Sequence, residues 1–165
     1  MNKPAEILQP PPPTMRDKVG PRPPAFDADA IARAEAALKG LSENFQEWIA
    51  ADIDKLDAAR LNARAAHYSE QSLEDVFARA HDIKGLGTTY DYPLATAIAA
   101  SLCRLTETPI ARAAAACAPM LVDAHVDALR AVVRDRAQDP DHPTGNKLAA
   151  ELAAHVDALV GPAAD

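Results

Sequence analysis

The residues best suited to chemistry lie in one short stretch, Ala80-His81-Asp82-Ile83-Lys84-Gly85-Leu86-Gly87-Thr88-Thr89-Tyr90. A histidine side chain is largely neutral and nucleophilic at cellular pH. A phosphoryl group on one of its ring nitrogens would carry a charge on the order of −2, which a nearby ammonium stabilises. His81, with Lys84 three residues later, therefore predicts a phosphoryl-accepting imidazole with a cation to hold the phosphoryl oxygens.

The helix that carries His81 is expected to begin near Ser69 or Ser72, because serine is a good N-cap. At about 100° per residue, His81 falls roughly 100° from the centre of the apolar face, at the border between core and solvent. Gly85 lies one turn later, and each mid-helix glycine costs about 1 kcal/mol relative to alanine. We therefore expect Gly85 and Gly87 to leave room beside His81 for a partner to approach.

The chain lacks the parts of a kinase. It has neither a Gly-x-x-x-x-Gly-Lys loop nor a kinase catalytic motif. If His81 carries a phosphoryl group, another protein must supply it. We therefore expect a phosphoryl carrier that is not itself an enzyme and has no cofactor, with Mg²⁺ held by its partner.

The stretch from His81 to Tyr90 resembles the His-x-(Ile/Leu)-Lys-Gly-x-(Gly/Ala/Ser) signature of histidine-containing phosphotransfer domains, four-helix-bundle modules of two-component phosphorelays. The resemblance implies that His81 is the phospho-acceptor, that Lys84 stabilises the phosphoryl group and that Gly85 clears space beside the ring. It implies receiver domains of hybrid histidine kinases and response regulators as partners. Asp91 departs from the family, which usually has glycine there, so a different turn is expected after the active helix.

The composition predicts an all-α protein, because alanine is abundant and long β-branched or aromatic runs are absent. The expected architecture is an antiparallel four-helix bundle with one additional helix or a kinked N-terminal helix, over residues 26–161. Residues 1–25 hold eight of the fourteen prolines and are expected to form a disordered tail. Helical spacing predicts helices over 27–61 (one, or two broken near Gly40), from Ser69 or Ser72 through Gly87, and over 93–105, 119–137 and 145–160.

Charge and hydropathy exclude several classes of partner. The net charge of −7 argues against nucleic acid, whose recognition needs clustered lysine and arginine. No stretch of about 18 apolar residues predicts a membrane span, and the N-terminus has no signal-peptide pattern. A monomeric protein of the cytoplasm is therefore expected.

Two other functions remain open. A helical adaptor would bind a partner without moving phosphate, and its glycines would serve close helix packing. A dimeric relative of histidine-kinase phosphoacceptor domains would match His81 to Lys84, but Gly85-Leu86 departs from the pattern of those domains, which have a small polar residue and a proline there.

The remaining candidates are expected to be structural. Surface or border positions are expected for His67, His125, His142 and His155, and a surface position for Asp82. Core positions are expected for Phe45, Trp48, Cys103 and Cys117, and a docking patch beside His81 is expected to include Leu86 and Tyr90.

Overall fold

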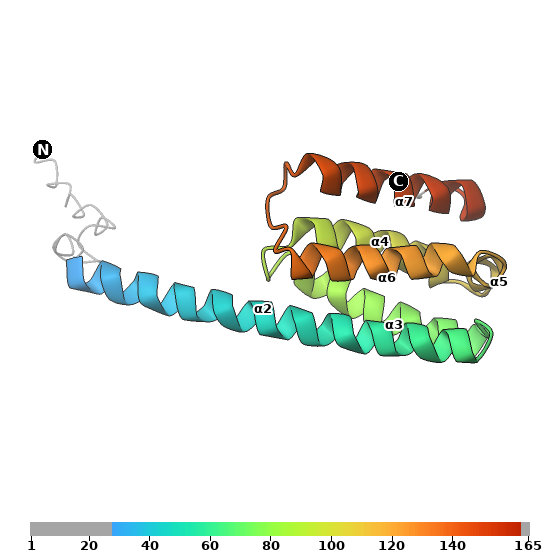
Figure 1. The fold of residues 1–165 in the computed structure, drawn as a ribbon, viewed down its shortest axis with the longest axis horizontal. Coiled ribbons are helices and arrows are strands. Elements are labelled where there is room, and N and C mark those ends of the chain that lie inside the picture. Colours follow the sequence, from blue (N-terminus) through green and yellow to red (C-terminus); the bar gives the residue numbers. More distant parts are fainter. Residues whose placement is uncertain (1–27, 163–165) are drawn as a thin grey trace, which may run out of the picture. The chain divides into compact units, whose positions relative to one another are not determined.

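The computed structural model describes residues 28–162, so the predicted tail over residues 1–25 lies outside the described residues. The chain divides into two units, residues 1–38 and 39–165. The described residues form helices and no strand (Figure 1), which confirms the all-α class. The helices are α2 (Ala28–Ala65), α3 (Glu70–Gly87), α4 (Pro93–Thr106), α5 (Pro109–Cys117), α6 (Pro119–Arg134) and α7 (Pro143–Val160).

Local signals explain where the helices begin. The Ser69 hydroxyl accepts a hydrogen bond from the backbone N–H of Ser72 at 3.4 Å, which caps α3 as predicted. Thr108 caps α5 in the same way, accepting from the N–H of Ala111 at 3.1 Å. Four helices begin at a proline, a position where the missing N–H costs nothing: Pro93, Pro109, Pro119 and Pro143.

The structure decides between the two forms left open for the first region, and it adds one helix that was not predicted. The first region is a single helix, α2, which runs through Gly40 without a break. A glycine inside a helix is unfavourable but does not by itself end it. The short helix α5 is the one that was not predicted. Its first residue, Pro109, cannot continue the preceding helix but is well suited to start a new one.

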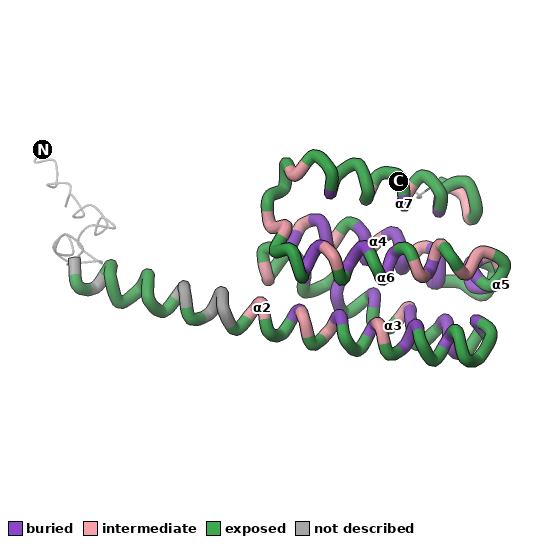
Figure 2. The backbone as a smooth tube through the Cα atoms, in the orientation of Figure 1, coloured by how far each residue is buried: buried purple, intermediate pink, exposed green. Residues whose placement is uncertain are grey.

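In the unit that begins at Lys39, α4 is the central helix. It contacts α3, α5, α6 and α7, and nine of its 14 residues are buried. Figure 2 shows the buried residues gathered on α4, on α6 and on the inner faces of α2 and α3. This core consists mainly of Leu, Ile, Val and Ala side chains, as the composition predicts. None of the described helices is both long and apolar enough to span a bilayer.

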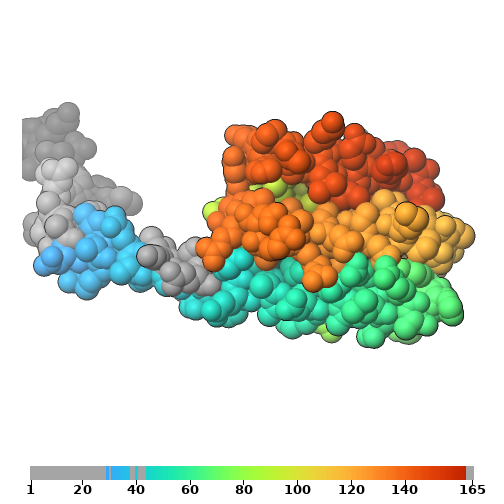
Figure 3. Space-filling view, in the orientation of Figure 1, coloured from blue at the N-terminus to red at the C-terminus, as the bar shows by residue number. Residues whose placement is uncertain are grey.

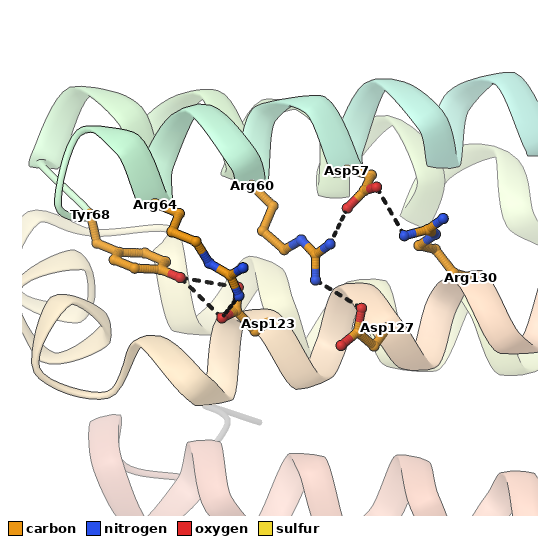
Figure 4. Close-up of polar contacts among 7 residues, drawn as sticks. All are labelled: Asp57, Arg60, Arg64, Tyr68, Asp123, Asp127 and Arg130. Carbon is orange, nitrogen blue, oxygen red and sulfur yellow. Dashed lines mark hydrogen bonds and ion pairs between the residues drawn. The ribbon is translucent and has the colours of Figure 1, made fainter.

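A polar network joins α2, and the turn after it, to α6 (Figure 4). Figure 3 shows one face of the molecule, on which α6 lies between α2 and α7. The side chain of Arg60 is only 9% exposed and pairs with Asp57 at 2.5 Å and with Asp127 at 2.8 Å. The network also contains Arg64, Tyr68, Asp123 and Arg130. Because α2 presents charge as well as apolar side chains to α6, the pairing of oppositely charged residues contributes to the register of the two helices.

The expected core positions were only partly correct. Trp48 is 49% exposed and Phe45 is partly buried. Their rings form a surface cluster with Tyr90, with centroids 5.3–6.4 Å apart. Cys103 is buried as expected, but Cys117 is exposed.

Candidate functional site

His81 lies on α3, and its side chain is exposed. Within residues 28–162, no hydrogen bond to its ring is formed, so both ring nitrogens are available. The ring contacts that of Phe77, with centroids 5.9 Å apart and planes tilted by 42°. One side of the imidazole therefore faces the ring of Phe77.

The other side of the ring is open at Gly85. A Cβ atom built on Gly85 would meet no heavy atom within 4 Å. Helical side chains lean towards the N-terminus of their helix, onto the residues three and four positions earlier. Any side chain at position 85 would therefore lean over His81, and glycine leaves that space empty.

Gly87 has a different role. A Cβ atom there would lie 2.5 Å from Oγ1 of Thr96 and 3.2 Å from its backbone nitrogen. Gly87 is also the last residue of α3, where α3 packs against the start of α4. The prediction that Gly87 leaves room for a partner is therefore wrong, since this glycine allows two helices of the same chain to approach closely.

Lys84 supplies a positive charge one turn after His81. Its side chain is exposed, and it forms no ion pair with any carboxylate in the described part of the chain. Burial raises the pKa of the Cys103 thiol to about 11, while the charge of Lys84 acts in the opposite direction. Lys84 therefore has an exposed ammonium that no carboxylate of the described residues pairs with, and that is available to an anion.

Asp82 lies on the exposed side of α3, as expected. Its carboxylate approaches the guanidinium of Arg79 at 3.7 Å, and both side chains are about half exposed. Exposed ion pairs of this kind contribute little to stability. The arrangement gives Asp82 no contact with the ring of His81.

Leu86 and Tyr90, which were predicted for a docking patch beside His81, do not adjoin its ring. Leu86 follows His81 by five residues and lies about 140° around the helix from it. Tyr90 packs against Phe45 and Trp48 of α2. Leu86 therefore lies on a different flank of α3 from His81, and Tyr90 lies in the turn after the helix.

The turn after α3 keeps the form that glycine favours. The N–H of Tyr92 donates to the carbonyl of Gly87 at 2.8 Å, and the N–H of Asp91 donates to that of Thr88 at 3.2 Å. This pair of bonds is the Schellman motif, which needs a left-handed residue before its last position. Asp91 has φ of +63°. The expectation of a different turn is wrong, because aspartate tolerates the left-handed region that glycine normally occupies.

His125 is not the surface or border residue that was expected. It is fully buried, with Nδ1 2.7 Å from the carbonyl oxygen of Leu121 and Nε2 3.0 Å from Oγ of Ser101. A carbonyl can only accept, so Nδ1 carries the hydrogen and Nε2 accepts from the serine hydroxyl. Burial lowers the pKa of His125, although the bond to Leu121 partly offsets that effect. His125 is therefore a neutral core residue whose ring nitrogens are both engaged.

The other three histidines differ from His81 in their surroundings. His142 is partly buried, and its Nδ1 caps α7 by accepting from the N–H of Gly145 at 3.0 Å. His67 and His155 are exposed, like His81. Exposure alone does not distinguish His81. His81 is distinguished by the combination of its exposure with an unpaired lysine and with a glycine that leaves the position one turn later empty.

Residues 28–162 contain no group of three or more His, Cys, Asp or Glu side chains arranged to hold a metal ion. Comparison with protein-family models, with curated proteins and with solved structures finds no match to the chain. What the site can do chemically thus follows from its own geometry, which offers an exposed nucleophilic ring, a nearby cation and open space on one side.

Proposed function

We propose that this protein is a histidine phosphotransfer module that carries a phosphoryl group on His81 between receiver-domain aspartates. The observation that carries the proposal is the imidazole of His81, which is exposed and bears no hydrogen bond within residues 28–162. Beside it, Lys84 offers an unpaired ammonium and Gly85 leaves the ring uncovered.

The proposed reaction is an in-line displacement at phosphorus. A ring nitrogen of His81 attacks the phosphorus of an aspartyl phosphate, and an N–P bond forms as the P–O bond to the donor carboxylate breaks. The carboxylate keeps the electron pair of that bond, and the remaining ring N–H proton can pass to solvent. The reverse sequence loads a second aspartate. Such transfers depend on positioning and charge stabilisation more than on covalent chemistry from the protein.

The protein's own contribution is small in this proposal. Lys84 binds the phosphoryl oxygens, and the bare surface at Gly85 admits the loops of the receiver around its aspartate. The receiver domains, belonging to hybrid histidine kinases and response regulators, supply Mg²⁺ and the acceptor carboxylate. The protein is then a carrier in the cytoplasm with no kinase activity of its own.

The fold is proposed to be the four-helix bundle of such modules, acting as a monomer. The candidate bundle helices are α2, α3, α4 and α6, with α5 and α7 as additions. In support, α4 contacts both α3 and α6, and ion pairs hold α2 to α6. A monomeric mass by light scattering would argue against the dimeric alternative.

The test is phosphoryl uptake from a panel of receiver domains phosphorylated with radioactive phosphate. The wild-type chain is expected to take up label that is lost in acid and kept in base, as expected for phosphohistidine. His81→Gln is expected to take up none, whereas His155→Gln, a change at another exposed histidine on α7, labels normally. Full labelling of His81→Gln would overturn the proposal.

A non-catalytic adaptor is the second candidate, and one observation favours it. Gly87 serves helix packing, which is the role that the adaptor hypothesis gives to the glycines. Binding of a partner without phosphoryl uptake from any receiver in the panel would support this candidate instead.

A further inference from the structure

We propose that Phe77 is a positioning residue for phosphoryl transfer, holding the imidazole of His81 so that it meets a partner from the side of Gly85. This inference rests on the proposed function. It starts from the ring contact between Phe77 and His81, whose centroids lie 5.9 Å apart.

Phe77 is itself held in place. It is partly buried and packs against the hydrophobic core, while His81 is exposed. Phe77 precedes His81 by four residues, so the two side chains lie on adjacent turns of α3. Because helical side chains lean towards the N-terminus, the imidazole leans onto the phenyl ring. The partly buried phenyl ring therefore supports an imidazole that is exposed to solvent.

Within the described residues, no polar group helps Phe77 to orient the imidazole. The ring of His81 accepts and donates no hydrogen bond there, in contrast to catalytic histidines that a carboxylate or carbonyl orients. A hydrogen bond to one ring nitrogen would fix the tautomer, and it would engage the lone pair or the N–H of that nitrogen. An aromatic neighbour restricts the rotation of the ring and leaves both nitrogens available.

The two sides of His81 along its own helix therefore differ. Phe77 occupies the position one turn before the ring, and Gly85 leaves empty the position one turn after it. Lys84 follows the ring by three residues, and its side chain is exposed. This arrangement restricts the orientations of the ring before a partner docks, and such preorganisation lowers the entropic cost of reaching the in-line geometry.

The experiment compares Phe77→Leu and Phe77→Met, which keep an apolar side chain, with Phe77→Tyr, which keeps the ring. Both apolar variants are checked for native folding by circular dichroism. Single-turnover transfer from a phosphorylated receiver is measured over a range of receiver concentrations. The apolar variants are expected to lower the rate constant at saturation about tenfold, since small misplacements cost rate. The half-saturating concentration should change less than twofold, and Phe77→Tyr should restore the rate.

A second measurement does not depend on transfer. The ring proton signals of His81 in NMR spectra should shift when the phenyl ring is removed, because an adjacent aromatic ring displaces them. Phe45→Leu is the matched control, because the ring of Phe45 contacts Trp48 and Tyr90 instead. It should leave the signals of His81 in place.

The outcomes separate the two proposals. Wild-type uptake with an unchanged rate constant in a folded Phe77→Leu or Phe77→Met variant would overturn the inference and leave the proposed function intact. Unmoved His81 signals in those variants would also overturn it. No uptake by the wild-type chain from any receiver would remove the proposed function and this inference together.

Discussion

Gly85→Ala is expected to stabilise the protein while slowing phosphoryl transfer. The new methyl group would meet no heavy atom within 4 Å, so it introduces no clash in the folded state. Replacing a glycine inside a helix by alanine gains about 1 kcal/mol, because the unfolded chain loses conformational freedom. For a chain of 165 residues, this corresponds to a rise in Tm of about 2–4 °C.

The same substitution is expected to slow the proposed phosphoryl transfer. A side chain at position 85 leans towards His81, on the side from which a receiver is proposed to approach. We expect transfer to slow about tenfold in Gly85→Ala and about 100-fold in Gly85→Leu, because a shift of about 1 Å in a reacting group can have an effect of that size. A gain in stability with a loss of activity is the pattern of a residue retained for function.

Gly87→Ala is the matched control, since the same change is made two residues later in α3. Its Cβ would lie 2.5 Å from Oγ1 of Thr96 and 3.2 Å from the Thr96 nitrogen, which cannot rotate away. We expect a loss of about 1–3 kcal/mol. Urea unfolding and single-turnover transfer measure both effects. Equal destabilisation by the two changes, or wild-type transfer by a folded Gly85→Leu variant, would refute the argument.

Three further predictions concern the frame around the site. Burial lowers the pKa of His125 below its unfolded value of about 6.5, so below that pH the unfolded chain binds a proton that the folded chain does not. Its contribution to stability should fall by up to about 1.4 kcal/mol per pH unit below pH 6.5, and urea unfolding of His125→Gln should show a flatter pH profile. Asp91→Gly should raise the free energy of unfolding by about 1 kcal/mol, because the φ of Asp91 is +63° and glycine adopts this angle without strain. Thermal unfolding measures the effect, and a lower Tm would contradict the prediction. Arg60→Met should lower the free energy of unfolding by about 1–3 kcal/mol, because it leaves Asp57 without one of its partners. An unchanged urea midpoint would show that the pairing of Arg60 with Asp57 and Asp127 contributes nothing.

The parts of the fold that depend on local signals were predictable from the sequence. Ser69 begins α3 and Pro93 begins α4, as the capping residues indicate. The buried position of His125 also had a signal. It stands in the apolar stripe of α6 with Val122, Val126 and Leu129, at the spacing of a core face. The general tendency of histidine to lie at the surface outweighed that spacing in the prediction.

The features that depend on contacts between helices were not predictable in this way. Gly85 and Gly87 look alike in the sequence, yet only Gly87 lies against α4. The exposure of Trp48 likewise depends on how α2 packs, since its spacing alone fits a buried stripe. The contact of Phe77 with His81 is an intermediate case. The spacing of four residues is visible in the sequence, but the contact between the two rings depends on how Phe77 packs against the core.

The contrast between His81 and His125 shows why environment, and not residue type, decides which imidazole can act as a nucleophile. A nucleophilic nitrogen needs a free lone pair, space for the electrophile and charge compensation for the product. Burial of His125 removes the space, and its bonds to Leu121 and Ser101 occupy both nitrogens. The ring of His81 has no hydrogen bond within the described residues and lies between a supporting phenyl ring and an empty position. Exchange of the two environments would exchange the two roles, which makes the surroundings of His81 the appropriate target for mutation.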